Sequence, residues 1–100
     1  MKTPNWIQNL KADPLPWLLE PQDAAVRAVT LRDLLDVPAD DADLLKAEAS
    51  AVENGPVASL LNEMRPDGYW VVEGPGYLPK YRSTVWSFIT LAQLGAKTHW

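Results

Sequence analysis

A group of aromatic and basic side chains in the last third of the chain could bind a ligand. Lys80, Tyr81 and Arg82 are consecutive, and Tyr77 and Trp86 lie close on either side of them. Lysine and arginine can hold an anion by charge, and aromatic faces attract cations or stack on aromatic ligands. The same residues could equally form a loop whose stems cover the core while the charges reach water. The sequence therefore identifies Tyr77, Lys80, Tyr81, Arg82 and Trp86 as a candidate ligand-binding site.

A second group with possible chemistry is the set of carboxylates at Asp40, Asp41 and Asp43. Hard cations take carboxylate oxygens, so this group invites a magnesium–diphosphate interpretation. The usual Asp-Asp-x-x-Asp pattern is not met, because Leu44 occupies the fifth position. Acidic residues are also favoured at the positive end of a helix. We interpret the group as the start of a helix and predict no metal site.

The residue types needed for catalysis are scarce. The chain has no cysteine and one histidine, His99, so thiolate nucleophiles and thiolate metal ligands are excluded. The hydroxyls of Ser83, Thr84 and Ser87 have no histidine nearby in sequence to serve as a general base. The glycines at 74–76 lack the Gly-Lys-Ser/Thr of a phosphate loop, and we expect them to reverse the chain. We predict no catalytic residue and no cofactor.

Composition limits the class of protein and its partners. The 100 residues are 47% hydrophobic and 22% charged, with a formal net charge of −4 at pH 7. An acidic surface repels phosphates, so we expect no nucleic-acid partner and no peripheral role on anionic membranes. The sequence contains no apolar stretch near the ~20 residues of a membrane span, and its first residues lack a signal-peptide core. We expect a single cytoplasmic domain.

The elements that would position these residues are helices. Residues 1–16 carry three prolines and no clear period, so we expect an arm with one loose helical turn around residues 6–10. Trp17, Leu18 and Leu19 are expected to dock this arm onto a helical domain over residues 17–100. Apolar periodicity and stop signals predict four helices in that domain, over residues 23–35, 40–53, 56–64 and 84–94.

The predicted fold is all-α, with about four main helices arranged as two antiparallel α-hairpins. Residues 69–72 could form a short extended stretch between the third and fourth helices. Ser83 is expected to cap the fourth helix through its hydroxyl.

The fourth predicted helix has an unusual composition, because no charged residue occurs from Thr84 to Leu94. A helix that is apolar nearly all round is expected to be buried on most sides. Such a helix is too apolar for the outside of a four-helix bundle. We therefore expect that the chain oligomerises or is a piece of a longer chain.

Three segments together resemble a repeat unit of the terpenoid cyclase and protein prenyltransferase superfamily, the α/α toroid: Leu60–Trp70, Tyr77–Trp86 and Leu91–Gly95. In that family the end of a helix carries the pattern Gln-x-x-x-Gly-x-Trp, where x is any residue. A loop then leads into a helix that closes on Leu-Gly. Gly68 and Trp70 match this pattern, whereas Met64 replaces the glutamine. The resemblance covers Val57 to Gly95 and implies a helical-hairpin repeat.

The catalytic and zinc-binding motifs of the superfamily are absent from this sequence. Class II terpene cyclases protonate their substrate with an Asp-x-Asp-Asp motif, which this sequence lacks. Protein prenyltransferases bind zinc through Asp, Cys and His, and a chain without cysteine cannot build that site.

Three functional hypotheses stay open at this point. The first is a non-catalytic helical-repeat domain that associates with itself or docks with the remainder of a toroid. The second is the opening segment of a larger prenyltransferase-like or terpene-cyclase-like enzyme, with its catalytic residues beyond Trp100. The third is a small-ligand binding module that uses the residues around Trp86.

Overall fold

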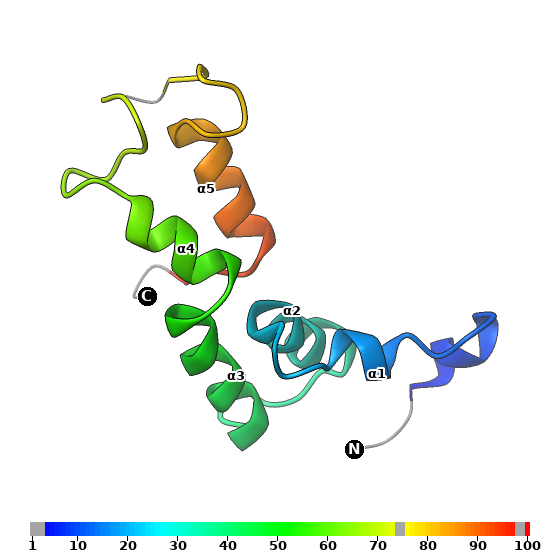
Figure 1. The fold of residues 1–100 in the computed structure, drawn as a ribbon. Coiled ribbons are helices and arrows are strands. Elements are labelled where there is room, and N and C mark those ends of the chain that lie inside the picture. The colour runs from blue at the N-terminus through cyan, green and yellow to red at the C-terminus, as the bar shows by residue number, and fades with distance from the viewer. Residues whose placement is uncertain (1–3, 74–75, 98–99) are drawn as a thin grey trace.

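The computed structural model describes residues 4–73, 76–97 and 100, and in these ranges it contains five α-helices and two short helices of other types but no strand. The all-α prediction is confirmed. The molecule is elongated, with extents of 47 × 28 × 19 Å. Figure 1 shows α4, α5 and their connecting loop at one end, with α2 and α3 below them and α1 to the side.

The N-terminal arm forms a 3-10 helix, η1 (Asn5–Asn9), and a single turn, α1 (Leu15–Leu18). The expected helical turn near Trp6 is therefore confirmed, and α1 crosses the expected boundary between arm and domain. The expected docking of Trp17 is wrong, because 69% of this residue is exposed. Leu19 packs against the core instead. Residues two apart on a helical turn point in different directions, so both could not face inward.

The first long helix consists of α2 (Ala24–Val29) and η2 (Thr30–Leu34), which follows without a break. Together they match the helix predicted over residues 23–35. The second part is a π-helical turn, and the hydroxyl of Thr30 donates to the carbonyl of Val26 at 2.7 Å. The helix ends at Asp36, whose φ of 52° turns the chain towards the next helix.

The other three predicted helices are confirmed with small shifts at their ends. The carboxylate of Asp41 accepts a hydrogen bond from the backbone N–H of Leu44 at 3.0 Å, so the acidic group at 40–43 does begin a helix. Gly55, with a φ of 88°, separates the second helix from the third. The three helices are α3 (Ala42–Glu53), α4 (Pro56–Glu63) and α5 (Thr84–Gln93).

Two small apolar clusters form the core. One lies between the first long helix and α3, and consists of Ala28, Leu31, Leu44 and Ala47. The other joins α2, α3, α4 and α5 and contains Ala24, Ala25, Ala51, Val57, Trp70 and Leu91. Alanines make up half of each cluster, so the helices approach closely and bury little side-chain volume per residue. The arrangement as two antiparallel hairpins stays a prediction.

The segment after α5 returns to the first half of the molecule. Gly95 has a φ of 79°, and a Cβ built on it would lie 2.7 Å from Cγ2 of Val29. Two residues later, the ammonium of Lys97 pairs with Oε2 of the buried Glu48 on α3. These two contacts connect the end of α5 to α2 and α3.

Replacing Gly95 by Ala should destabilise the fold by about 2–4 kcal/mol, because the new methyl group adds a clash with Val29 to the strain of a left-handed backbone. Gly68→Ala is the matched control. Its φ is 84° and no atom lies within 4 Å of the added Cβ, so it carries backbone strain without a clash and should cost about 1–2 kcal/mol. Urea unfolding followed by far-UV circular dichroism measures both, and equal losses would contradict the close approach at Gly95.

Candidate functional site

The residues that the sequence proposed for ligand binding lie in the loop before α5 and in its first turn. The ring centres of Tyr77 and Trp86 are 5.2 Å apart, and those of Tyr81 and Trp86 are 4.9 Å apart. The Lys80 ammonium lies 5.1 Å from the centre of the Tyr81 ring. The structure therefore gathers two tyrosines around one indole, with Lys80 beside the ring of Tyr81.

The carbonyl of Tyr77 holds this loop in place. It accepts one hydrogen bond from Nε1 of Trp86 at 3.0 Å and another from the hydroxyl of Ser83 at 2.8 Å. Ser83 does occupy the N-cap position of α5, but the predicted cap through its hydroxyl is wrong, because the hydroxyl bonds this carbonyl instead. The polar edge of Trp86 is thereby satisfied, and only its ring remains for other contacts.

Lys80 and Arg82 supply two exposed positive charges to this loop. Neither has a carboxylate oxygen within 4 Å among residues 4–73, 76–97 and 100. The Arg82 guanidinium also donates no hydrogen bond to the described part of the chain, although its backbone N–H bonds the carbonyl of Pro79 at 3.2 Å. Both cations can therefore meet an external anion without first breaking an ion pair.

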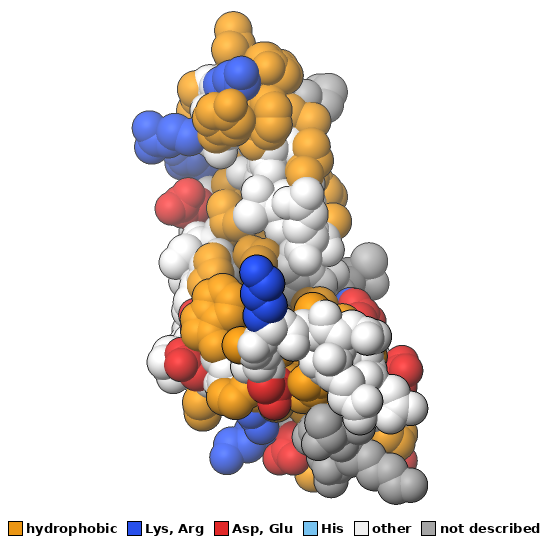
Figure 2. Space-filling model, turned by 90° about the vertical axis from the view of Figure 1, so that its right-hand side faces the viewer, with side chains coloured by type: hydrophobic (Ala, Val, Ile, Leu, Met, Phe, Trp, Pro, Cys, Tyr) orange, Lys and Arg blue, Asp and Glu red, His pale blue; other side chains and the backbone are white. Residues whose placement is uncertain are grey.

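Exposed apolar side chains accompany these charges, and the sequence analysis did not identify them. Leu78 and Tyr81 are each 70% exposed, and Val71 and Val72 are also exposed. Figure 2 shows hydrophobic side chains gathered with Lys and Arg side chains at the end of the molecule where this loop lies. Periodicity cannot predict such a surface, because it arises from irregular backbone rather than from a helix face.

The uncharged helix α5 has one buried face and one exposed face. Thr84, Ser87 and Leu91 are buried, whereas Phe88 is 59% exposed and Ile89 is 44% exposed. The expectation that this helix is covered on most sides is therefore not met by the chain itself. Small polar side chains, rather than large apolar ones, occupy most of the inward face, which leaves the large apolar ones outside.

A groove of about 250 Å³ runs beside Phe88, between α4, α5 and the C-terminal segment. Met64, Ala92 and Trp100 also line it. A second groove, of about 550 Å³, lies on α3 and shares Lys97 and Trp100 with the first. We refer to Met64, Phe88, Ile89 and Ala92 as the α5 surface.

Trp70 connects α4 to α5 beneath this surface. It is 2% exposed, and its Nε1 donates to the carbonyl of Leu60 at 2.8 Å. Its backbone N–H donates to the hydroxyl of Thr84 at 2.9 Å. The centre of its ring lies 5.7 Å from the centre of the Phe88 ring, in an edge-to-face arrangement. The predicted extended stretch at 69–72 is wrong, because Val71 has a φ of 67° and the N–H of Val72 donates to the carbonyl of Trp70 at 2.8 Å, which bends the chain here.

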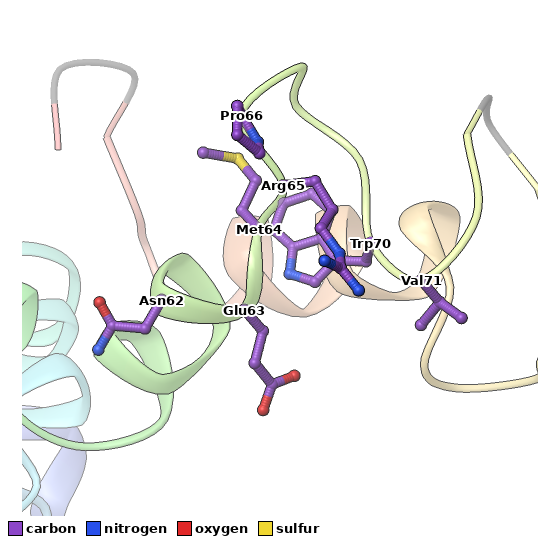
Figure 3. A pocket seen from close by; sticks show the side chains of 7 residues that line it. All are labelled: Asn62, Glu63, Met64, Arg65, Pro66, Trp70 and Val71. Atoms are coloured by element: carbon purple, nitrogen blue, oxygen red, sulfur yellow. The ribbon is translucent and has the colours of Figure 1, made fainter.

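An open pocket of about 530 Å³ lies beside Trp70 at the end of α4. Figure 3 shows Asn62 and Glu63 pointing away from Met64 and Pro66. The sharp turn that forms the pocket depends on Gly68, which has a φ of 84° and donates its N–H to the carbonyl of Arg65 at 2.8 Å. The Gly-x-Trp pair that carries the toroid resemblance thus has a structural role.

Acidic and histidine side chains do not converge on a metal site in the part of the chain that the structure describes. His99 lies outside the described residues. No helix among those residues is both long enough and apolar enough to cross a membrane.

The chain matches no protein-family model, no curated protein and no solved structure.

The hydrogen bond from the Trp70 backbone to the Thr84 hydroxyl, which we call the Trp70–Thr84 joint, can be tested by Thr84→Val. This substitution keeps the shape of the side chain and removes its hydroxyl. The backbone N–H of Trp70 is then buried without an acceptor, which should cost about 1–3 kcal/mol. Thr90→Val on the same helix is the control. The Thr90 hydroxyl is exposed, so its loss should cost less than about 0.5 kcal/mol. Chemical denaturation compares the two, and equal stabilities would contradict the joint.

Proposed function

We propose that this chain is a non-catalytic helical-repeat unit that docks through the α5 surface, and that in the isolated chain the partner is a second copy. The observation that carries the proposal is the exposure of Phe88 and Ile89 on a helix without charged residues. Contiguous exposed apolar surface on a small protein is typical of an interaction site.

The distribution of charge favours α5 over the rest of the molecule as the site of self-association. Residues 4–55 carry ten acidic and four basic side chains, so two copies of that half repel each other. Residues 56–97 carry three acidic and four basic side chains, and none of them lies on α5. Lys97 lines the groove beside Phe88 but is paired with Glu48, so two copies can bring their α5 surfaces together across a two-fold axis without unpaired like charges facing each other.

The local geometry around Trp70 supports a helical repeat of the α/α-toroid type. A buried indole fixes α4 to α5 at the position where the toroid pattern has its tryptophan. In helical-repeat architectures each unit leaves one apolar face for its neighbour, because a single unit cannot bury its own. The α5 surface fits that role for an adjacent unit of the same kind.

Sedimentation equilibrium over a range of protein concentrations tests the proposal. The unmodified chain should show a mass that rises with concentration, and Ile89→Lys should weaken the association at least about tenfold, because a lysine would be desolvated at the contact. Leu34→Lys is the matched control, since Leu34 is 42% exposed and lies on η2. An unmodified chain that stays monomeric throughout would contradict the proposal.

A further inference from the structure

The loop between α4 and α5 ends in a second exposed surface, separate from the α5 surface. Its most exposed apolar side chains are Val72, Leu78 and Tyr81, at 59%, 70% and 70%. The loop that carries them lies at one end of the molecule, beyond α4 and α5, as Figure 1 shows. A surface at the end of an elongated molecule can meet a flat partner without interference from the rest of the chain.

Three aromatic residues pack together at this surface. Tyr77 and Tyr81 both pack against Trp86, and the indole N–H already bonds the carbonyl of Tyr77. The apolar rings can therefore enter a less polar environment without carrying an unsatisfied indole N–H with them. Tyrosine and tryptophan concentrate at membrane–water interfaces for this combination of an apolar body and a polar edge.

The charge of the two ends differs, although the net charge alone argues against an anionic partner. Lys80 and Arg82 lie at the loop end, without an ion-pair partner among the described residues. Most of the acidic side chains belong to residues 4–55, at the other end. Figure 2 shows this separation, with acidic side chains concentrated below the loop end. Within the loop, residues 64–83, the carboxylates of Asp67 and Glu73 reduce the charge of Arg65, Lys80 and Arg82 to a net +1, so an anionic surface still attracts the loop.

We propose that the loop end, defined by Val72, Tyr77, Leu78, Lys80, Tyr81 and Arg82, binds the surface of an anionic lipid bilayer. Leu78 and Tyr81 enter the interfacial region, and Lys80 and Arg82 lie at the level of the lipid phosphates. A free anion would use the two cations alone and would leave the aliphatic side chains in water. Two cations and a few apolar side chains give weak and reversible attachment.

Vesicle co-sedimentation of the full chain tests this inference. The probes are phosphatidylcholine vesicles with and without about one-third phosphatidylserine, at low and at high salt. The chain should partition onto the anionic vesicles at least about fivefold more than onto the neutral ones, and salt should reduce the difference. Equal partition onto both kinds of vesicle, or none onto either, would overturn the inference.

Variants locate the contact on the molecule. Leu78→Ser and Arg82→Gln should each lower partition onto the anionic vesicles about threefold or more, because one removes apolar area and the other a cation. Trp17→Ser, at a residue of similar exposure on α1, and Lys46→Gln on α3 should leave it unchanged. Circular dichroism confirms that each variant is folded. Equal effects of the control pair and the loop pair would also overturn the inference.

The inference and the proposed function fail separately. Ile89→Lys should weaken self-association and keep vesicle binding, since Ile89 lies outside the loop end. If Leu78→Ser instead weakens self-association while the unmodified chain ignores vesicles, then the loop end is part of a protein contact and the lipid inference is wrong.

Discussion

The arrangement of α4 and α5 depends on one buried side chain, Trp70. Its indole bonds α4 through the carbonyl of Leu60, while its backbone bonds α5 through the hydroxyl of Thr84. The two helices are separated by twenty residues of loop, and ordering such a loop costs conformational entropy that scattered surface contacts do not offset. A large aromatic group with both of its N–H groups satisfied supplies the apolar area and the fixed geometry that the connection requires.

The same joint explains why α5 presents an apolar surface. The face of α5 that turns inward carries Thr84 and Ser87, whose hydroxyls bond the backbone of Trp70 and Arg82. Phe88 touches the edge of the Trp70 ring but keeps most of its surface outside. The interior of this half is thus built partly from polar contacts, and apolar area that a self-sufficient domain would bury stays accessible. That surplus is the physical basis of the proposed docking function.

Most of the helical structure could be predicted from the sequence, because proline, glycine and aspartate mark its ends. Asp41 caps the start of α3, and Gly55 separates α3 from α4. The hydrogen bond that the Ser83 hydroxyl donates to the carbonyl of Tyr77 could not be predicted. Whether this hydroxyl meets a helix amide or that carbonyl depends on the path of a long loop. The sequence grouped Tyr77 and Tyr81 with Trp86, and their rings do pack together, while ligand binding by this group stays a prediction. The sequence did not identify Leu78 and Val72 as surface residues, because side chains in a loop follow no regular period. The net charge of the whole chain also hid the fact that most acidic side chains lie away from the loop.

Hydrogen–deuterium exchange at two protein concentrations tests the central claim, that the α5 surface is a contact between helical units. The backbone amides of α5 should exchange several-fold more slowly at the higher concentration, while those of η2, on another side of the molecule, should exchange at the same rate at both. Exchange in α5 that does not depend on concentration would contradict the claim, because an occupied surface must stabilise the helix that carries it.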